Sequence, residues 1–364
     1  MSEEPSATPG FRFRDIALPA YGPTLVNSLG HGAMMPVLAL RARELGASVA
    51  VAALVVALTS VGMLLASLPA GAVIASGMMW TAFLIARQGF MIDAVPFALR
   101  ARALSLLGGS HRVGLFGGPL LGAALIAADG IRAVFLLAGA LSLAAAALAL
   151  TMPDLGAGTR ATARQEGYAS VLSVLLRHRR EMLTIGVAIA VIGASRSVRT
   201  SLMPLWAEHV GISASTTSLI FAVASGIELL MVYPGGWVMD RHGRAVTAVP
   251  VAASAALACL LLPLATTVAA VTAVMVLLAA GNGLGSGVVM TMGADTAPSE
   301  ARAQFLGGMR LSGDIGMTSA PLLLSAVATV LPLAGAALIL GAIGLAGTAW
   351  VGYWTRHLDR RLGF

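Results

Sequence analysis

Four ionisable residues interrupt long apolar stretches in the second half of the sequence: Arg196, Arg199, Glu228 and Asp314. A charged side chain within a membrane span is costly unless it is paired or hydrated, so such residues are candidates for function. Arg196 and Arg199 are three residues apart and share one helix face. Similar depths in neighbouring spans make an ion pair between Arg196 and Glu228 feasible. The alternatives for these charges are a purely structural ion-pair network and a role in transport. The carboxylates can carry protons, and the arginines can hold an anion.

Three further polar residues lie inside apolar segments. Asn27 and His31 are four residues apart near the middle of the first span, at the depth where transporters bind substrate. They are candidates for lining a cavity, and the alternative is a hydrogen bond between helices. Asn282 lies between two glycines, which favours packing at a close helix crossing over a polar contact with a substrate.

Other kinds of chemistry find little support in the sequence. It shows no metal-ligand cluster, nucleophile triad or phosphate-binding loop, and its single cysteine, Cys259, lies in an apolar run. We therefore expect no enzyme activity, no cofactor and no metal. The formal charge of +7 comes from arginine, because the chain contains no lysine. In a membrane protein this excess indicates cytoplasmic loops and not nucleic-acid binding.

The elements that must position these residues are membrane-spanning helices. The 364 residues are 58% hydrophobic and 11% charged, with a mean hydropathy of +0.88, whereas soluble domains carry about 25% charged residues. A span needs about 20 mostly apolar residues. The sequence predicts an all-α polytopic membrane protein with about eleven apparent spans. They lie near 16–40, 50–75, 77–96, 113–128, 131–152, 182–205, 215–239, 245–263, 271–293, 304–329 and 333–354.

Arginines fall on every second joint of the second half, which is the positive-inside pattern. This predicts a multi-pass protein of the cell (plasma or inner) membrane whose C-terminus is cytoplasmic. We divide the chain into an N-terminal helical bundle at 1–152, a cytoplasmic linker at 153–181 and a six-helix bundle at 182–364.

An internal repeat relates the two halves. Residues 93–100 (Asp-Ala-Val-Pro-Phe-Ala-Leu-Arg) match residues 295–302 (Asp-Thr-Ala-Pro-Ser-Glu-Ala-Arg) at an offset of 202. Upstream, residues 69–71 match residues 234–236 at an offset of 165. The difference between the two offsets, 202 − 165 = 37, is the length of one loop plus one helix. The N-terminal bundle therefore lacks these residues near 75/76, and two complete symmetric halves would have twelve spans. The same offset of 202 pairs Gly114 with Gly316 and Pro119 with Pro321.

Eleven full spans place the two termini on opposite sides of the membrane. The alternative is that the uncharged run 46–86 holds one span plus a partly inserted segment, which keeps the termini on one side. The charge pattern near the N-terminus does not choose between these topologies.

A loop motif ends the span at 215–239. Its residues are Gly236, Asp240, Arg241, Gly243 and Arg244. We expect Asp240 to interact with the N-terminus of a neighbouring helix, where the dipole favours negative charge. Gly243 permits a sharp turn, and the two arginines suit the anionic headgroup layer.

This pattern resembles the cytoplasmic-loop signature of the major facilitator superfamily, in the drug and small-molecule efflux branch. Two further motifs carry the resemblance, and the first half lacks its own copy of the loop signature. Arg87 and Gly89 resemble the arginine motif of the family's fourth helix. A fifth-helix motif that is typical of antiporters is matched by Gly114, Gly118, Pro119 and Gly122.

The resemblance implies a secondary active transporter whose two halves rock around a central site. We expect proton-coupled efflux of small molecules, with Glu228 or Asp314 taking up the proton. The expected partners are a small-molecule substrate, the coupling proton and the lipid bilayer, without nucleic acid. Two alternatives stay open: uptake or exchange of organic anions held by Arg196 and Arg199, and a truncated family member that does not transport.

Overall fold

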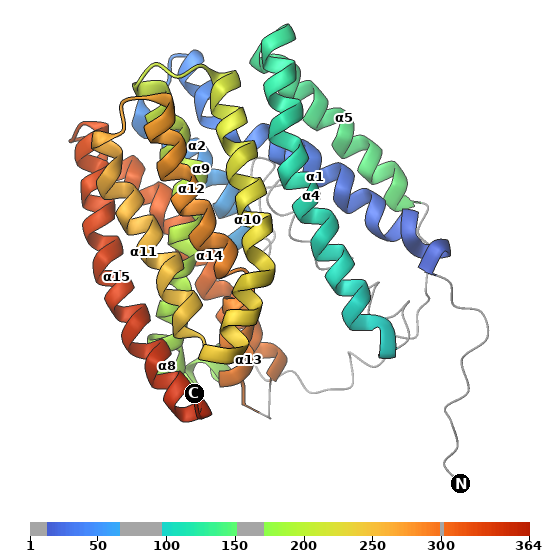
Figure 1. Cartoon of the computed structure of the whole chain (residues 1–364), viewed down its shortest axis with the longest axis vertical. Helices are drawn as coiled ribbons and strands as arrows, with labels where there is room; N and C mark the ends of the chain where they lie inside the picture. Colours follow the sequence, from blue (N-terminus) through green and yellow to red (C-terminus); the bar gives the residue numbers. More distant parts are fainter. Residues whose placement is uncertain (1–12, 66–96, 151–170, 299–301) are drawn as a thin grey trace.

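A computed structural model describes residues 13–65, 97–150, 171–298 and 302–364, and these parts of the chain are helical without strands (Figure 1). The first half contributes α1 (Phe13–Glu44), α2 (Val49–Leu65), α4 (Phe97–Asp129) and α5 (Ile131–Leu150). The second half contributes the short α7 (Val171–Arg177), α8 (Arg179–Glu181) and η1 (Met182–Gly186), followed by α9 (Val187–His209), α10 (Ala214–His242), α11 (Ala245–Leu261), η2 (Leu262–Leu264), α12 (Val268–Leu284), α13 (Val288–Thr296), α14 (Arg302–Val327) and α15 (Leu333–Leu362).

Membrane insertion follows from these helices. Seven helical segments in the described parts of the chain are long and apolar enough to cross a bilayer. Large apolar side chains are also exposed along them: Leu143 is 74% exposed, Met290 72% and Leu230 67%. Apolar surfaces of this extent are unfavourable in water, whereas in a bilayer they contact lipid tails. The protein is an all-α polytopic membrane protein.

Most predicted spans coincide with helices, and three differ in detail. The helix expected at 113–128 begins much earlier, at Phe97. The span expected at 271–293 is divided by a turn between α12 and α13. The last helix continues beyond 354 through its basic end to Leu362. The span expected at 50–75 begins as α2, and the remainder, together with the span at 77–96 and the gap near 75/76, lies outside the described residues.

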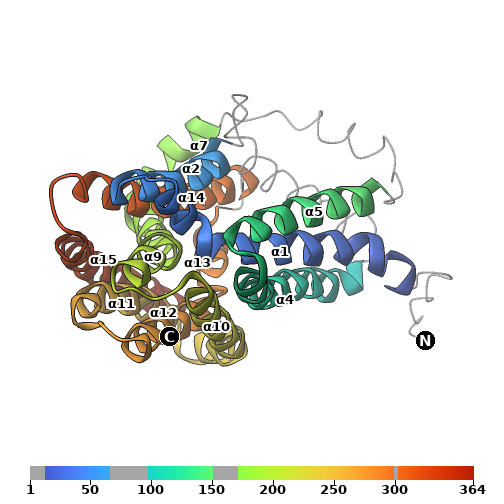
Figure 2. The same cartoon turned by 90° about the horizontal axis from the view of Figure 1, so that it is seen from above.

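The helices form two groups that meet along a seam. Figures 1 and 2 show α1, α4 and α5 beside one another, next to a larger group built from the helices of the second half. Across the seam α10 packs on α4, and α1 also touches α9. The helix α2 lies against α14 of the larger group. The seam is therefore the surface between α1 and α4 on one side and α9 and α10 on the other.

Glycines allow the closest helix crossings in both groups. A Cβ added at Gly114 would lie 2.4 Å from the Cβ of Ser28, and one at Gly118 would lie 2.5 Å from the carbonyl of Leu29, so α4 crosses α1 in backbone contact. In the second half a Cβ at Gly316 would overlap the Ala190 carbonyl, which brings α14 onto α9 in the same way. The repeat-related glycines thus make equivalent crossings.

The helix directions place both ends of the described chain at one face. Successive contacts of Gly114 and Gly118 with α1 show that α4 and α1 run in the same direction. Arg43, at the end of α1, pairs with Glu208, at the end of α9. The helix α15 runs the opposite way and returns to the start of α9, where Trp350 donates to the carbonyl of Thr184. Of the two topologies left open by the sequence, this arrangement agrees with the one that has both termini on one side.

Candidate functional site

An ion pair lies near the middle of the larger group, beside the seam. The Nη1 atom of Arg199 on α9 is 2.5 Å from Oε2 of Glu228 on α10, with side chains 14% and 25% exposed. The ion pair of Glu228 is therefore with Arg199, and the expectation that Arg196 is its partner is wrong. The two arginines share a helix face, but the rotation of α9 against α10 brings the second one to the carboxylate.

Arg196 turns instead to the break between α12 and α13. Its Nη2 donates to the carbonyl of Gly285 at 2.8 Å. That carbonyl follows the last residue of α12, where the helix does not continue. Among the described backbone groups, the N–H of Val288 donates to it, at 3.2 Å. The turn therefore supplies an acceptor for a guanidinium in the middle of a span.

Arg112 reaches the same turn from the other side of the seam. This residue lies midway along α4 and donates from Nη2 to the hydroxyl of Ser286, the residue after Gly285. Sequence reasoning missed Arg112, because the predicted span began at residue 113. The repeat was the available signal, since the offset of 202 pairs Arg112 with Asp314, already singled out as a charge inside a span.

Two histidines extend the polar cluster into the smaller group. Nδ1 of His111 lies 2.7 Å from the hydroxyl of Ser28, which joins α4 to α1. His111 interacts electrostatically with His31, and also with Glu228 across the seam. His31 therefore belongs to this polar cluster. The sequence had made His31 a candidate for lining a cavity. Asn27 points elsewhere, because its Oδ1 accepts a long 3.4 Å bond from Ser142 on α5.

Asn282 and Asp314 occupy different surroundings. Asn282 is 4% exposed, lies one turn before Ser286, and its Oδ1 has no hydrogen-bond partner within the described residues. Added Cβ atoms at the glycines on either side would collide with α11 and α10, which agrees with a close crossing there. Asp314 lies half-buried on α14, where Arg310 is its electrostatic neighbour, and no described contact joins it to the cluster.

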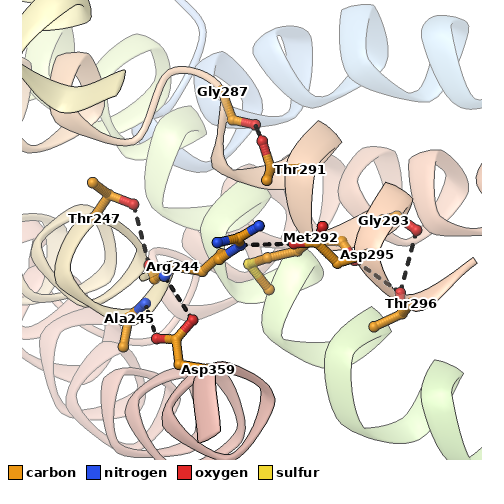
Figure 3. A network of polar contacts seen from close by, with 10 residues as sticks. All are labelled: Arg244, Ala245, Thr247, Gly287, Thr291, Met292, Gly293, Asp295, Thr296 and Asp359. Carbon is orange, nitrogen blue, oxygen red and sulfur yellow. Dashed lines mark hydrogen bonds and ion pairs between the residues drawn. The ribbon is translucent and has the colours of Figure 1, made fainter. Parts of the chain in front are cut away.

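The loop motif after α10 forms a second polar site, at the end of the bundle that carries the C-terminus (Figure 3). Arg244 makes a 2.7 Å ion pair with Asp295 at the end of α13 and lies over the ring of Phe364. Arg241 lies over the ring of Trp237. Gly243 has φ of +87°, which confirms the predicted turn.

The carboxylate at the start of α11 is Asp359, not Asp240. Both of its oxygens accept backbone N–H groups, from Arg244 at 2.7 Å and from Ala245 at 2.9 Å (Figure 3). Asp240 is exposed at the end of α10, and it makes no hydrogen bond or ion pair with any residue whose side chain the structure describes. The start of α11 is therefore capped by a residue 115 positions away from Arg244. The contact expected between Asp240 and the N-terminus of a neighbouring helix stays a prediction.

The glycines of the fifth-helix motif pack against a neighbouring helix. Gly114, Gly118 and Gly122 line the α1 side of α4, and α4 continues as a helix through Pro119. A Cβ at Gly236 would meet nothing within 4 Å. Arg87 and Gly89 lie outside the described residues. Within the described parts of the chain, no three His, Cys, Asp or Glu side chains gather as a metal site requires.

Charged groups at mid-depth beside the seam between two groups of spanning helices are typical of membrane transport proteins. The sequence profile of the Major Facilitator Superfamily matches residues 72–321 and, separately, residues 185–362. The chain therefore belongs to the Major Facilitator Superfamily. No curated protein sequence matches it significantly.

Solved transporters share the fold. A POT family transporter in complex with a thioalcohol-conjugated peptide superposes with a TM-score of 0.71 at 11% identity, over 95% of this chain and 96% of that one. A bacterial homologue of the human lysosomal transporter Spinster, in an inward-facing and unoccupied conformation, superposes with a TM-score of 0.60 at 13% identity, over 96% and 94% of the chains. At these identities the likeness concerns the fold alone.

Proposed function

We propose that this protein is a proton-coupled secondary transporter that exports small molecules by alternating access. The observation that carries the proposal is the ion pair of Glu228 with Arg199 at mid-depth beside the seam. A carboxylate there holds its charge only while it is paired or hydrated. Protonation of Glu228 would release Arg199 and change the charge of the site, which is how a proton can be coupled to the binding of cargo.

The contacts across the seam support alternating access. At the face where α1 and α9 end, Arg43 bonds both carboxylate oxygens of Glu208, at 3.1 and 2.9 Å. Near the same face, the hydroxyl of Ser215 on α10 donates to the carbonyl of Ala123 on α4 at 3.0 Å. These polar contacts close one face and can break without unfolding either group, as rocking of the two groups requires.

The direction of transport and the orientation of the chain are also proposed. The glycine row of α4 resembles the motif of the family's antiporters, which favours export. The basic residues Arg241, Arg244, Arg356, Arg360 and Arg361 all lie at the end that carries the C-terminus, so we place this end in the cytoplasm of a cell with the protein in its cell membrane.

Proton-driven export from proteoliposomes tests the proposal. An acid-outside gradient is imposed on vesicles loaded with a panel of fluorescent small molecules, and the release rate is followed. The Glu228→Gln and Asp314→Asn variants should lose the proton-dependent component, whereas Glu44→Gln, which alters an exposed carboxylate at the end of α1, should retain it. Undiminished proton-dependent rates in both span variants would rule out these carboxylates as proton carriers.

A further inference from the structure

Two guanidinium groups from opposite sides of the seam converge on consecutive residues. Arg196 from α9 donates to the carbonyl of Gly285, and Arg112 from α4 donates to the hydroxyl of Ser286. Both acceptors are neutral, and both lie in the turn that interrupts a span of 29 residues. The two helices belong to the groups that the proposed transport cycle moves against each other.

The charges around this turn do not balance. Glu228 is the carboxylate that interacts with the described cluster, and its short ion pair is with Arg199. Arg112 and Arg196 also repel each other. The described cluster therefore contains three arginines and one carboxylate, an excess of two positive charges in the middle of the membrane. Such charges persist where a counter-charge is supplied.

The geometry of the arginines suits one kind of counter-charge. A guanidinium has five N–H donors in a planar fork that matches the two oxygens of a carboxylate or phosphate. Among the described residues, one nitrogen of Arg112 and one of Arg196 make hydrogen bonds. The other donors of each fork can bind a ligand.

The broken helix adds one feature that favours an anion and one that can bind another part of the cargo. The helix α13 begins at Val288, and its N-cap residue Gly287 makes no side-chain capping bond, so the dipole of this helix end can favour an anion. Interrupted helices with such ends hold anionic groups in other transporters. One turn earlier, the buried Oδ1 of Asn282 has no partner within the described residues. As an acceptor it would bind a hydroxyl or N–H group elsewhere on the cargo and not the oxyanion itself.

We propose that Arg112 and Arg196 together bind an oxyanion of the cargo, a carboxylate or a phosphate, at the turn between α12 and α13. The inference rests on the proposed transport function and names the chemical class of its substrate. An anion bound from both groups at once bridges the two guanidinium groups and offsets their mutual repulsion.

Binding of defined anions to the full-length chain in phosphatidylcholine nanodiscs tests this site. The probes are inorganic phosphate, glycerol 3-phosphate, succinate and benzoate, compared with the cation tetraphenylphosphonium and with glucose, and binding is read from the shift in melting temperature. At least one anionic probe should bind, and its Kd should rise at least tenfold in Arg112→Ala and Arg196→Ala. The matched control Arg310→Ala alters an exposed arginine on α14 and should bind as the parent does.

Two further variants separate binding from a structural role. Arg112→Lys keeps the charge but not the fork, so binding should weaken partially while the protein stays monodisperse. Ser286→Ala removes the neutral acceptor of Arg112 and leaves the charge in place, so anion binding should be retained. A loss of binding in Ser286→Ala equal to that in Arg112→Ala, at unchanged affinity in Arg112→Lys, would assign the arginine to holding the turn and overturn the proposal.

The remaining outcomes are also decisive. If only tetraphenylphosphonium or glucose binds, or if neither the soluble anions nor phosphatidylglycerol bind, the anion site is refuted, while transport is judged separately in proteoliposomes. If anions bind but no probe is moved by proteoliposomes, the site stands and the transport function fails. If soluble anions bind nowhere and only phosphatidylglycerol in the nanodisc shifts the melting temperature, the oxyanion is a lipid headgroup and the cargo assignment is wrong.

Discussion

Replacing Asp359 by alanine should destabilise the larger helix group. This carboxylate is 7% exposed and accepts the first backbone N–H groups of α11 at 2.7 and 2.9 Å. Hydrogen bonds to charged groups contribute about 1.5–3 kcal/mol each, so two of them at the lower end give about 3 kcal/mol. At about 2 °C per kcal/mol for a chain of this size, the apparent melting temperature should fall by about 6 °C.

The assay is thermal unfolding of the detergent-purified protein, followed by the fraction that stays monodisperse. Asp359→Asn keeps one acceptor oxygen and loses the charge, so it should lie between the parent and alanine. The matched control is Asp240→Ala, at an exposed carboxylate, which should change the stability by less than about 0.5 kcal/mol. An equal loss in both alanine variants, or no loss at Asp359, would refute the capping geometry described here.

Two paired glycine substitutions test the turn and the closest crossing. Gly243→Ala should destabilise the protein by at least about 1 kcal/mol, because φ is +87° and the new Cβ would lie 2.6 Å from the Asp359 carboxyl carbon, whereas Gly236→Ala should be silent in the same melting assay. Gly118→Ala should separate α4 from α1 and lower the melting temperature, whereas Gly109→Ala, on the same helix with open space around it, should leave it unchanged or raise it slightly. Equal effects within either pair would contradict the packing.

Hydropathy and charge predicted most of the helices because both depend on local sequence. Apolar runs of about 20 residues bounded by arginines or by turn residues mark a span whatever lies beside it. The start of α4 was missed for the same reason, since His111 and Arg112 interrupt the apolar run that a span should show. The break at Gly285 was also missed, because no charged residue marks it, although the run Gly-Asn-Gly-Leu-Gly-Ser-Gly at 281–287 was a signal for it.

The partners of the charged residues could not be read from the sequence. Arg196 and Arg199 share a helix face, and only the rotation of α9 against α10 decides which one meets Glu228. The capping of α11 by Asp359 could not be predicted for a similar reason, because it depends on where the end of α15 lies. Such choices depend on packing between helices far apart in the chain.

The movement of the two helix groups against each other is tested most directly by pairs of spin labels at the two faces of the seam. In a Cys259→Ala background, one pair replaces Leu45 and His209 beside the Arg43–Glu208 contact, and the other replaces Gly109 and Tyr233 on the opposite side of the charged cluster. Pulsed electron paramagnetic resonance in nanodiscs, with and without a bound anion and at two pH values, should give distances that change in opposite directions. One fixed distance for each pair under all conditions would contradict alternating access.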